Sequence, residues 1–382
     1  MPIDFDTPIE RAGTWSMRWD RYRGRDVIPL WVADTDFRAP DAVIEALRAR
    51  VEHGVFGYTV APDELREAIV ERLARLYAWR VDPAWIVFLP GVVPGLHLAV
   101  RQLSEATHRV LLPTPIYQHF RYAAERAPRA YDSVPLALQA GRWVLDERRL
   151  AAKLRPESKL LLLCNPQNPG GTVFTRAELE RIAELAEKHA LIVCSDEIHA
   201  DLILEPGARH VPIASLAPEI SRRSVTLMSP NKTYNIPGVG CAWAIVEDEN
   251  LRRRFSADLH ATVPDPSLLG YVAALAAYRG GDAWLAAQLD YLRANLELVA
   301  NAVRAMPGLA MAKLEATYLA WLDATSLRVK DPHAHFLEYG VALSPGAQFG
   351  APGFVRLNFG TQRARLAEAL RRMQRAAHAA AA

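Results

Sequence analysis

CSDEIH at residues 194–199 and SPNKT at residues 229–233 each follow a short apolar run of the kind that forms a buried strand. Asp196 stands at the end of the first run, and Lys232 lies just beyond the end of the second. In a parallel α/β sheet the carboxyl ends of neighbouring strands meet at one edge, where ligands bind. The two stretches therefore predict an α/β fold in which Asp196 and Lys232 lie side by side.

Short apolar runs alternate with helix signals between residues 86 and 246. Runs that are apolar throughout suit strands that are covered on both faces. One intervening helix is well marked, because Thr175 and Glu178 form a capping box before an apolar stripe. The alternation predicts a mostly parallel sheet with helices on both faces. The strand-like runs are 86–89, 110–112, 159–164, 191–194, 225–228 and 241–246.

Helix patterns flank this region on both sides. Upstream, one helix is predicted to begin at Pro40 and end at Gly54, and a second to follow Pro62. The second helix is expected to turn four side chains inward: Leu65, Ile69, Leu73 and Leu76.

After about residue 265 the chain becomes rich in helix and alanine. Helical patterns run through residues 284–303 and 363–377, and strand-like segments lie between them at residues 318–322 and 355–359. We therefore expect a large domain over residues 40–265. A smaller α+β domain would combine residues 1–39 with residues 266–382.

The composition, 51% hydrophobic and 23% charged over 382 residues, is that of an ordinary globular protein. Its 45 basic and 43 acidic residues form no long run of one sign, so we expect no nucleic-acid partner. No apolar stretch reaches the ~20 residues of a membrane helix, and residues 1–6 carry acids rather than the basic region of a signal peptide, so we expect none. The three cysteines lack the spacing of a disulfide framework or a metal site. These features predict a cytoplasmic enzyme that contacts neither membrane nor metal.

Pyridoxal phosphate is a cofactor that needs a lysine and a carboxylate together. The lysine holds its aldehyde as a Schiff base, and the carboxylate keeps its pyridine nitrogen protonated. Four other residues fall just after strand ends and would converge on the same edge. Each alone has an ordinary explanation as a cap, a turn or a core residue, and only their joint occurrence favours the cofactor. They are Gly91, Tyr117, Asn168 and Ser229.

With these residues in view, the chain resembles the fold-type I pyridoxal-phosphate enzymes of the class I/II aminotransferase superfamily. Within it, DEIH and the early WVAD segment favour the MalY/PatB-type cystathionine β-lyases, which are C–S lyases. The resemblance implies the fold-type I architecture of a large domain and a smaller one. The matching segments are LWVADTDF (30–37), FGYT (56–59), WIVFLPGVVPGL (85–96), PTPIYQHF (113–120), LLLLCNPQNPGG (160–171), VCSDEIHADL (193–202), SPNKTYNIPG (229–238) and FVRLNFG (354–360).

The resemblance assigns roles around the cofactor ring. Lys232 would bind the cofactor covalently and then remove the α-proton of the substrate. Asp196 would pair with the pyridine nitrogen, and Tyr117 would stack on the ring. Asn168 and His199 would hydrogen-bond its phenolic oxygen.

The resemblance also implies where the phosphate and the substrate bind. The phosphate would lie at Gly91, on the backbone amides of Val92 and Val93 at the start of a helix. Ser229 would add a hydroxyl, and Tyr58 would reach the phosphate from a second subunit, which implies a homodimer with shared active sites. Arg356, with Asn168, would hold the substrate carboxylate.

Many aminotransferases carry a phosphate-binding arginine eight residues after the lysine, where this chain has Gly240, so phosphate binding would rely more on backbone amides, Ser229 and Tyr58. Segments 168–171 and 229–231 also depart from the pattern of the similar lyases, which leaves the substrate open. The segments 6–37 and 339–349 are expected to line the substrate pocket, but their residues name no ligand.

Four hypotheses about the function remain. The favoured one is β-elimination from cystathionine or a related cysteine conjugate, giving a thiol, pyruvate and ammonia. An aminotransferase, or a specialised biosynthetic enzyme with the same cofactor, would need the same residues. A regulatory protein that keeps the cofactor site as a sensor is a further alternative, because fold alone does not settle function.

Overall fold

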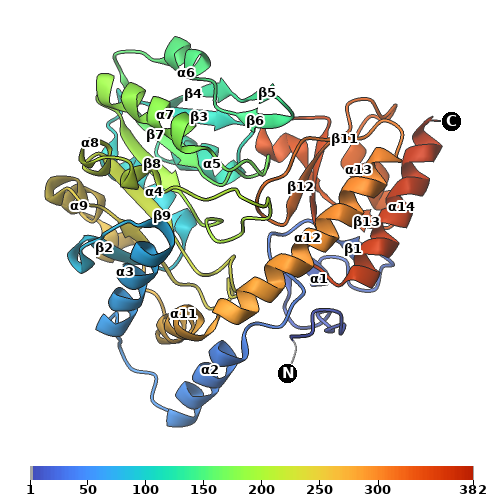
Figure 1. The fold of residues 1–382 in the computed structure, drawn as a ribbon, viewed down its shortest axis with the longest axis horizontal. Coiled ribbons are helices and arrows are strands. Elements are labelled where there is room, and N and C mark those ends of the chain that lie inside the picture. Colours follow the sequence, from blue (N-terminus) through green and yellow to red (C-terminus); the bar gives the residue numbers. More distant parts are fainter. Residues whose placement is uncertain (1–2, 382) are drawn as a thin grey trace.

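The structure is a computed structural model that describes residues 3–381, and its centre is a seven-stranded sheet (Figure 1). The strand order is β2-β10-β9-β8-β7-β3-β4. Every pairing is parallel except those of β10, which runs antiparallel to both its neighbours. This confirms the predicted mostly parallel sheet. The strands are β2 (Ile86–Leu89), β3 (Arg109–Thr114), β4 (Ala130–Pro135), β7 (Ser158–Cys164), β8 (Ile192–Asp196), β9 (Ser224–Met228) and β10 (Ala242–Ile245).

Helices cover both faces of this sheet, which explains its continuous apolar runs. Val193 packs with α7 (Arg176–Lys188) on one face, while the next residue, Cys194, packs with α4 (Val92–Leu103) on the other. Successive strand residues point to opposite faces, so both must be apolar. The predicted capping box of Thr175 and Glu178 begins α7. The other helices of this part are α5 (Gln118–Arg126), α6 (Glu147–Lys153), α8 (Pro218–Ser221), α9 (Glu249–Phe255) and α10 (Leu259–Thr262).

Strand β4 lies at the edge of the sheet and was not among the predicted strands. Its residues are mostly part-exposed or exposed, so no apolar run marks it in the sequence. A short hairpin of β5 (Ala137–Gln139) and β6 (Arg142–Val144) follows it.

The two upstream helices form as predicted. They are α2 (Asp41–His53), which ends at Gly54 with φ 76°, and α3 (Asp63–Tyr77). The prediction that Leu76 of α3 is turned inward was wrong, because its side chain is 42% exposed. The buried stripe ends at Leu73, and Tyr77 packs against the core in the last turn instead.

The second part of the chain is a four-stranded antiparallel sheet in the order β11-β12-β15-β14, packed against helices. The short β1 (Ile28–Pro29) pairs with β13 (Val341–Ala342), which ties the N-terminal segment to this part. That pairing fits the assignment of residues 1–39 to the smaller domain, and the boundaries at residues 40 and 265 remain our proposal. The elements are β11 (Ala310–Met311), β12 (Leu319–Asp323), α13 (Pro332–Glu338), β14 (Ser344–Pro345), β15 (Phe354–Asn358) and α14 (Arg363–Ala381).

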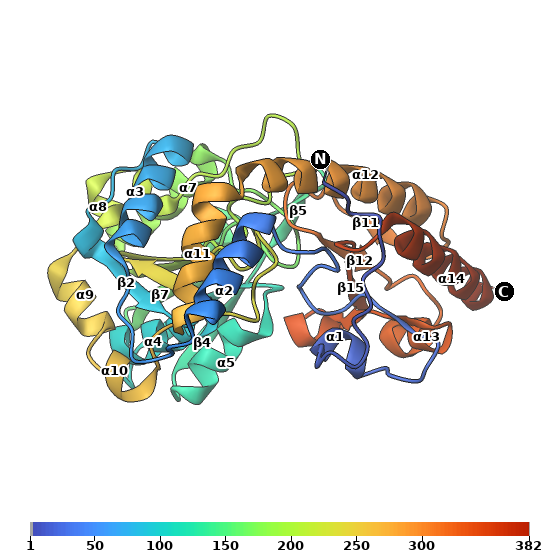
Figure 2. The ribbon, with the colours of Figure 1, turned by 90° about the horizontal axis from the view of Figure 1, so that it is seen from below.

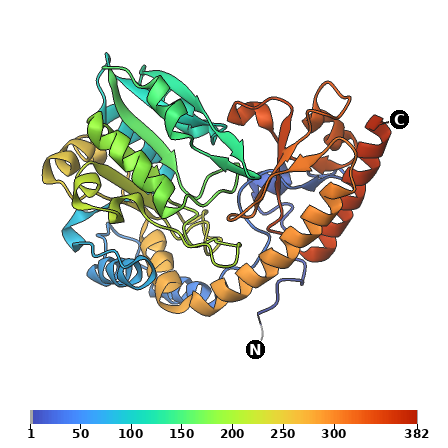
Figure 3. The same ribbon diagram turned by 45° about the horizontal axis from the view of Figure 1, so that its top comes forward.

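One long helix joins the two parts. Helix α11 (Leu268–Gly280) packs on α2, and α12 (Asp282–Arg304) then runs from there along the second part to α14 (Figures 2 and 3). Within residues 3–381, no helix is long and apolar enough to span a membrane.

Candidate active site

A cavity of about 440 Å³ opens where the carboxyl ends of the central strands face the second part of the chain. Loops after β2, β3, β7, β8 and β9 contribute to its wall, as does β15 of the smaller sheet. The volume lies in the range of small-molecule sites. Nine of the residues predicted for the site line it: Gly91, Val92, Val93, Tyr117, Asn168, Asp196, His199, Lys232 and Arg356.

Lys232 is half-buried in the wall of this cavity and has the properties of a base. Its Nζ donates a hydrogen bond to the backbone oxygen of Ala33 at 2.6 Å. Burial lowers the pKa of Lys232 to about 8, although the carboxylate of Asp34 opposes this change. A lysine with such a pKa is partly neutral near physiological pH, so it can accept a proton.

Asp196 ends strand β8 and supplies the negative group of the cavity. One carboxylate oxygen accepts a hydrogen bond from the backbone of Ile198 at 3.1 Å. Burial raises the pKa of Asp196 to about 7, and the neighbouring Glu197 acts in the same direction. A carboxylate in such a place is stabilised by a cation, and Lys232 provides part of this effect.

Arg356 is a buried cation, and no carboxylate of the described residues pairs with it. Its Nη1 donates to Oδ1 of Asn168 at 2.9 Å, and its Nη2 donates to the backbone oxygen of Trp31 at 3.1 Å. The ring of Phe349 lies 4.7 Å from the guanidinium carbon, and burial lowers the pKa of Arg356 to about 10. A buried guanidinium held only by neutral groups is ready to pair with an anionic ligand.

Two further groups in the cavity have unused hydrogen-bonding capacity. The Nδ1 atom of His199 is buried and has no hydrogen-bond partner among residues 3–381, and burial lowers the pKa of His199 to about 3, so the ring is neutral. Helix α4 begins at Val92 directly after Gly91, and no side chain caps its first turn. The free backbone N–H groups at such a helix start suit an anion such as a phosphate.

Two predicted residues do not line this cavity. The hydroxyl of Ser229 donates to the backbone oxygen of Cys241 at 2.6 Å and accepts from the backbone of Asn231. Tyr58 lies fully exposed on the loop between α2 and α3. The roles of both residues in phosphate binding stay predictions.

A steric contact explains why position 240 holds glycine rather than arginine. Gly240 adopts φ +51°, and a Cβ added there would lie 2.9 Å from the backbone oxygen of Pro90. Pro90 lies two residues before the start of α4, and its close backbone approach to Gly240 leaves no room for a side chain.

The segments expected to line the substrate pocket do line the cavity. They contribute Met17, Trp31, Val32 and Ala33 from the N-terminal side, and Ser344 and Gln348 from the C-terminal side. The backbone oxygen of Ala33, which meets both Lys232 and the hydroxyl of Tyr318, was not foreseen. A carbonyl oxygen leaves no signal in a sequence, because every residue has one.

A buried polar pair behind Asp196 was also missed. The Oε2 atom of Glu197 lies 2.7 Å from Nε2 of His210, and its Oε1 accepts from the hydroxyl of Ser195 at 2.8 Å. Because side chains alternate along a strand, Ser195 and Glu197 point away from the face that carries Asp196. The contact between Glu197 and His210 thus holds the carboxyl end of β8 in place on the face opposite to Asp196. Only the run of polar residues around Asp196 hinted at it.

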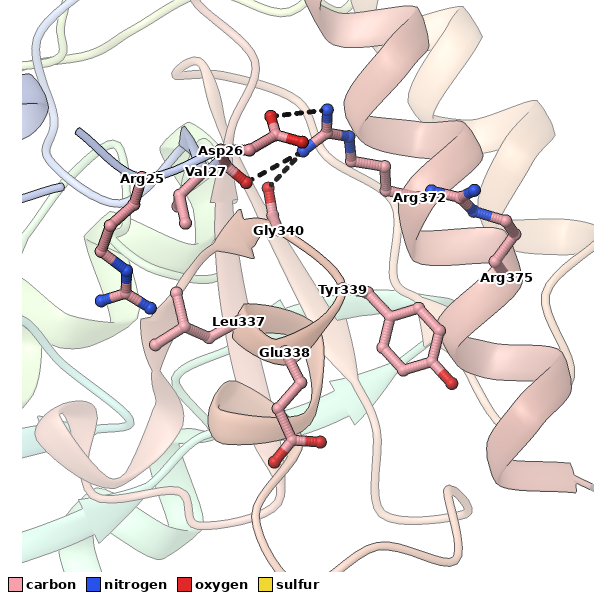
Figure 4. Close-up of a pocket in the computed structure, with 9 residues that line it drawn as sticks. All are labelled: Arg25, Asp26, Val27, Leu337, Glu338, Tyr339, Gly340, Arg372 and Arg375. Carbon is pink, nitrogen blue, oxygen red and sulfur yellow. Dashed lines mark hydrogen bonds and ion pairs between the residues drawn. The ribbon is translucent and has the colours of Figure 1, made fainter. Parts of the chain in front are cut away.

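A second, more open hollow of about 580 Å³ lies elsewhere, between the N-terminal segment and helix α14 (Figure 4). Arg372 of α14 connects two sides of this hollow: it forms an ion pair with Asp26 and donates a hydrogen bond to the backbone oxygen of Gly340. Tyr339 and Gly340, at the start of the segment expected to line the substrate pocket, lie here instead, and none of the residues predicted to bind the cofactor or the substrate carboxylate lines this hollow.

Comparison with known proteins agrees with this geometry. A model of the aminotransferase class I and II family matches residues 25–373. The chain belongs to this family. Cystathionine beta-lyase PatB from Bacillus subtilis is 37% identical over 98% of this chain and 100% of its own.

Two solved structures are also similar. OvoB is 49% identical with a TM-score of 0.96, covering 98% of this chain and 99% of its own. Cystalysin from Treponema denticola, whose crystal structure contains pyridoxal 5′-phosphate, is 30% identical with a TM-score of 0.93, covering 98% of this chain and 99% of its own. Such TM-scores establish the fold-type I architecture predicted from the sequence.

The pair behind Asp196 predicts a specific pattern of stability. His210→Ala removes a hydrogen-bond partner from the buried carboxylate of Glu197, so the free energy of unfolding should fall by roughly 3 kcal/mol. The double variant Glu197→Gln/His210→Gln carries no charge at either position, so its free energy of unfolding should fall by clearly less. Urea denaturation measures both. Equal losses in the two variants would show that the Glu197 carboxylate does not depend on His210.

The raised pKa of Asp196 predicts a pH-dependent cost to the ligand-free protein. The folded pKa of about 7 exceeds the ordinary value of 3.8, so stability falls as pH rises between them. After treatment with hydroxylamine, which releases carbonyl compounds held on a lysine, and then dialysis, Asp196→Asn should stabilise the protein by on the order of 4 kcal/mol at about pH 8. The gain should be smaller at about pH 5. Denaturation that gives the same gain at both pH values would contradict the assignment.

Proposed function

We propose that this protein is a pyridoxal-phosphate-dependent C–S lyase that cleaves a cysteine thioether by β-elimination. The observation that carries the proposal is the meeting in one cavity of Lys232, Asp196 and Arg356, and Arg356 has no carboxylate partner within the described part of the chain. The relative PatB is a cystathionine beta-lyase, which favours elimination among the reactions that this family performs.

The unused groups of the cavity fit the cofactor. Asp196 can pair with a protonated pyridine nitrogen, and the neutral ring of His199 has a buried Nδ1 free to bond a ring oxygen. Asn168, which accepts a hydrogen bond from Arg356, lines the same cavity, and so does the aromatic residue Tyr117. The start of α4, at Val92 and Val93, can bind the phosphate.

In the proposed mechanism the protein positions the substrate and moves a proton. Bound pyridoxal phosphate supplies an electron sink next to the substrate Cα. Arg356 binds the α-carboxylate through its two terminal nitrogens, which fixes the Cα–H bond toward Lys232. The Nζ atom of Lys232 takes the α-proton, helped by its lowered pKa.

The reaction balances with water as the only co-reactant. The C–S bond breaks, the sulfur leaves with the bonding electron pair, and it gains a proton to become a thiol. The aminoacrylate that is released reacts with water to give pyruvate and ammonia. An aminotransferase would share the cofactor, Lys232 and Arg356, but it would need a keto acid to complete its cycle.

We further propose a homodimer in which Tyr58 completes the phosphate site of the partner. Tyr58 is fully exposed, and the loop around it displays other apolar side chains to solvent. An exposed group of this kind marks a surface that another protein covers. The apolar members are Val51, Val55, Phe56 and Val60. The three buried, unpaired cysteines fit a reducing compartment, and we propose a cytoplasmic location.

The reaction type is tested by turnover without a keto acid. Purified protein with pyridoxal phosphate should release thiol and pyruvate from L-cystathionine or S-benzyl-L-cysteine over many turnovers. Lys232→Ala should lose the visible absorbance of the bound cofactor and at least about 1,000-fold of the rate, because the base is gone. Turnover that begins only when a keto acid is added would make the protein an aminotransferase.

Subunit mixing tests the shared site. Tyr58→Ala and Lys232→Ala should each be strongly impaired alone. In a heterodimer, one site would combine the intact Lys232 of one chain with the intact Tyr58 of the other. Random exchange of equal amounts should therefore restore up to about a quarter of wild-type activity, since half of the dimers would carry one intact site. No recovery after verified exchange would place Tyr58 outside the partner's site.

A further inference from the structure

Lys232 is followed in the chain by a buried residue that the proposed chemistry does not use. Thr233 is fully buried and, unlike Lys232, does not line the cavity. Its hydroxyl donates a hydrogen bond to Oδ2 of Asp201 at 3.1 Å. Asp201 lies in the turn that follows β8, five residues after Asp196. One hydrogen bond therefore joins the loop that carries the proposed base to the turn that carries the proposed partner of the pyridine nitrogen.

Asp201 is held in place by an ion pair with a helix. The Nη2 atom of Arg72, in α3, lies 3.0 Å from Oδ1 of Asp201, and the two side chains are only 5% and 9% exposed. The Nη1 atom of Arg72 lies 3.0 Å from a carboxylate oxygen of Asp282 at the start of α12, and the ring of Tyr278 lies 4.7 Å from the guanidinium carbon. Breaking such a buried pair would leave a charge without its partner. Asp201 is thus a fixed acceptor for the hydroxyl of Thr233.

The bonds of Thr233 differ from that of the lysine side chain, because they can persist while Lys232 works. Besides the bond of its hydroxyl, the backbone oxygen of Thr233 accepts from Nε2 of Gln288 at 2.9 Å. The Nζ atom of Lys232 donates to the backbone oxygen of Ala33, but it must leave that oxygen when it takes the α-proton in the proposed reaction. During proton transfer the place of Nζ therefore depends on how the backbone beside it is held.

We propose that Thr233 is a positioning residue, whose hydrogen bond to Asp201 fixes where Lys232 stands beside the substrate. The inference rests on the proposed lyase function, in which Lys232 removes the α-proton, and it adds a residue that acts through this base. A misplacement of ~1 Å can cost roughly 100-fold in rate, so the loss of this bond should appear in kcat. Because Thr233 does not line the cavity, KM should change little.

Variants that each remove one hydroxyl donor from Asp201 test this proposal, with L-cystathionine or S-benzyl-L-cysteine as substrate. Thr233→Val keeps the shape of the side chain, and kcat per bound cofactor should fall at least about tenfold while KM changes less than about threefold. Thr233→Ser restores the hydroxyl and should recover most of kcat. Tyr77→Phe removes the hydroxyl that donates to Oδ1 of Asp201 at 3.0 Å, but Arg72 still holds that oxygen, so kcat should stay within about twofold. Dividing each rate by the bound cofactor, read from its visible absorbance, removes the effect of a smaller folded fraction.

Amide hydrogen exchange in the cofactor-free protein gives a second readout that needs no activity. The amides of Tyr234 and Ile236 donate to backbone oxygens within the loop that carries Lys232. If the bond of Thr233 holds this loop, both amides should exchange at least about fivefold faster in Thr233→Val than in the wild type. Their exchange in Tyr77→Phe should match the wild type.

The outcomes separate this inference from the proposed function. An unchanged kcat per bound cofactor in Thr233→Val, or equal losses in Thr233→Val and Tyr77→Phe, would overturn the inference and leave the lyase intact. Failure of the wild-type protein to release thiol and pyruvate would overturn the lyase. The exchange measurement would then decide by itself whether Thr233 holds the loop of Lys232, and unchanged exchange in Thr233→Val would overturn that role as well.

Discussion

The burial of unlike charges in one cavity is the constraint on which this structure depends. Lys232, Asp196 and Arg356 are each taken out of water, and burial shifts the pKa of every one toward its neutral form. An arrangement of this kind costs folding free energy, because hydration is lost without full pairing. The charges are tolerated because seven strands and the helices on both faces supply a large apolar core. The same desolvation makes Lys232 a usable base and leaves Arg356 free for an anion.

The N-terminal segment closes this cavity through its backbone rather than its side chains. Asn358 of β15 donates to the backbone oxygens of Val32 and Asp34, and Tyr318 donates to that of Ala33. The Nζ atom of Lys232 reaches the same oxygen of Ala33. The extended stretch of residues 31–34 thus contacts Lys232, the proposed base, and Arg356, the proposed ligand of the substrate carboxylate. It also joins the smaller sheet. A shift of this stretch would disturb all three, which explains why buried salt bridges of Arg11 and Arg18 fix it so firmly.

The sequence predicted those parts of the fold that depend on periodicity and strand ends. Asp196, Asn168 and Lys232 converge because parallel strands end at one edge, a rule that needs no coordinates. Strand β4 was not predicted because an edge strand is not apolar throughout. Leu76 was predicted to be buried, but Tyr77 takes the core position in the last turn of α3. The His210 contact and the Ala33 oxygen depend on long-range packing. Neither leaves a local pattern in the chain.

The close approach of Gly240 to Pro90 connects the cavity with the proposed dimer. Because a side chain at position 240 would collide with that backbone, this chain cannot place an arginine there to neutralise a phosphate. The charge of a bound phosphate would then rest on the backbone amides at the start of α4, with their partial positive charge. Within one subunit, Tyr58 is turned out to solvent and cannot assist. A second subunit that brings its Tyr58 to this helix start would supply the missing donor, so in our proposal dimerisation completes the cofactor site rather than only stabilising the fold.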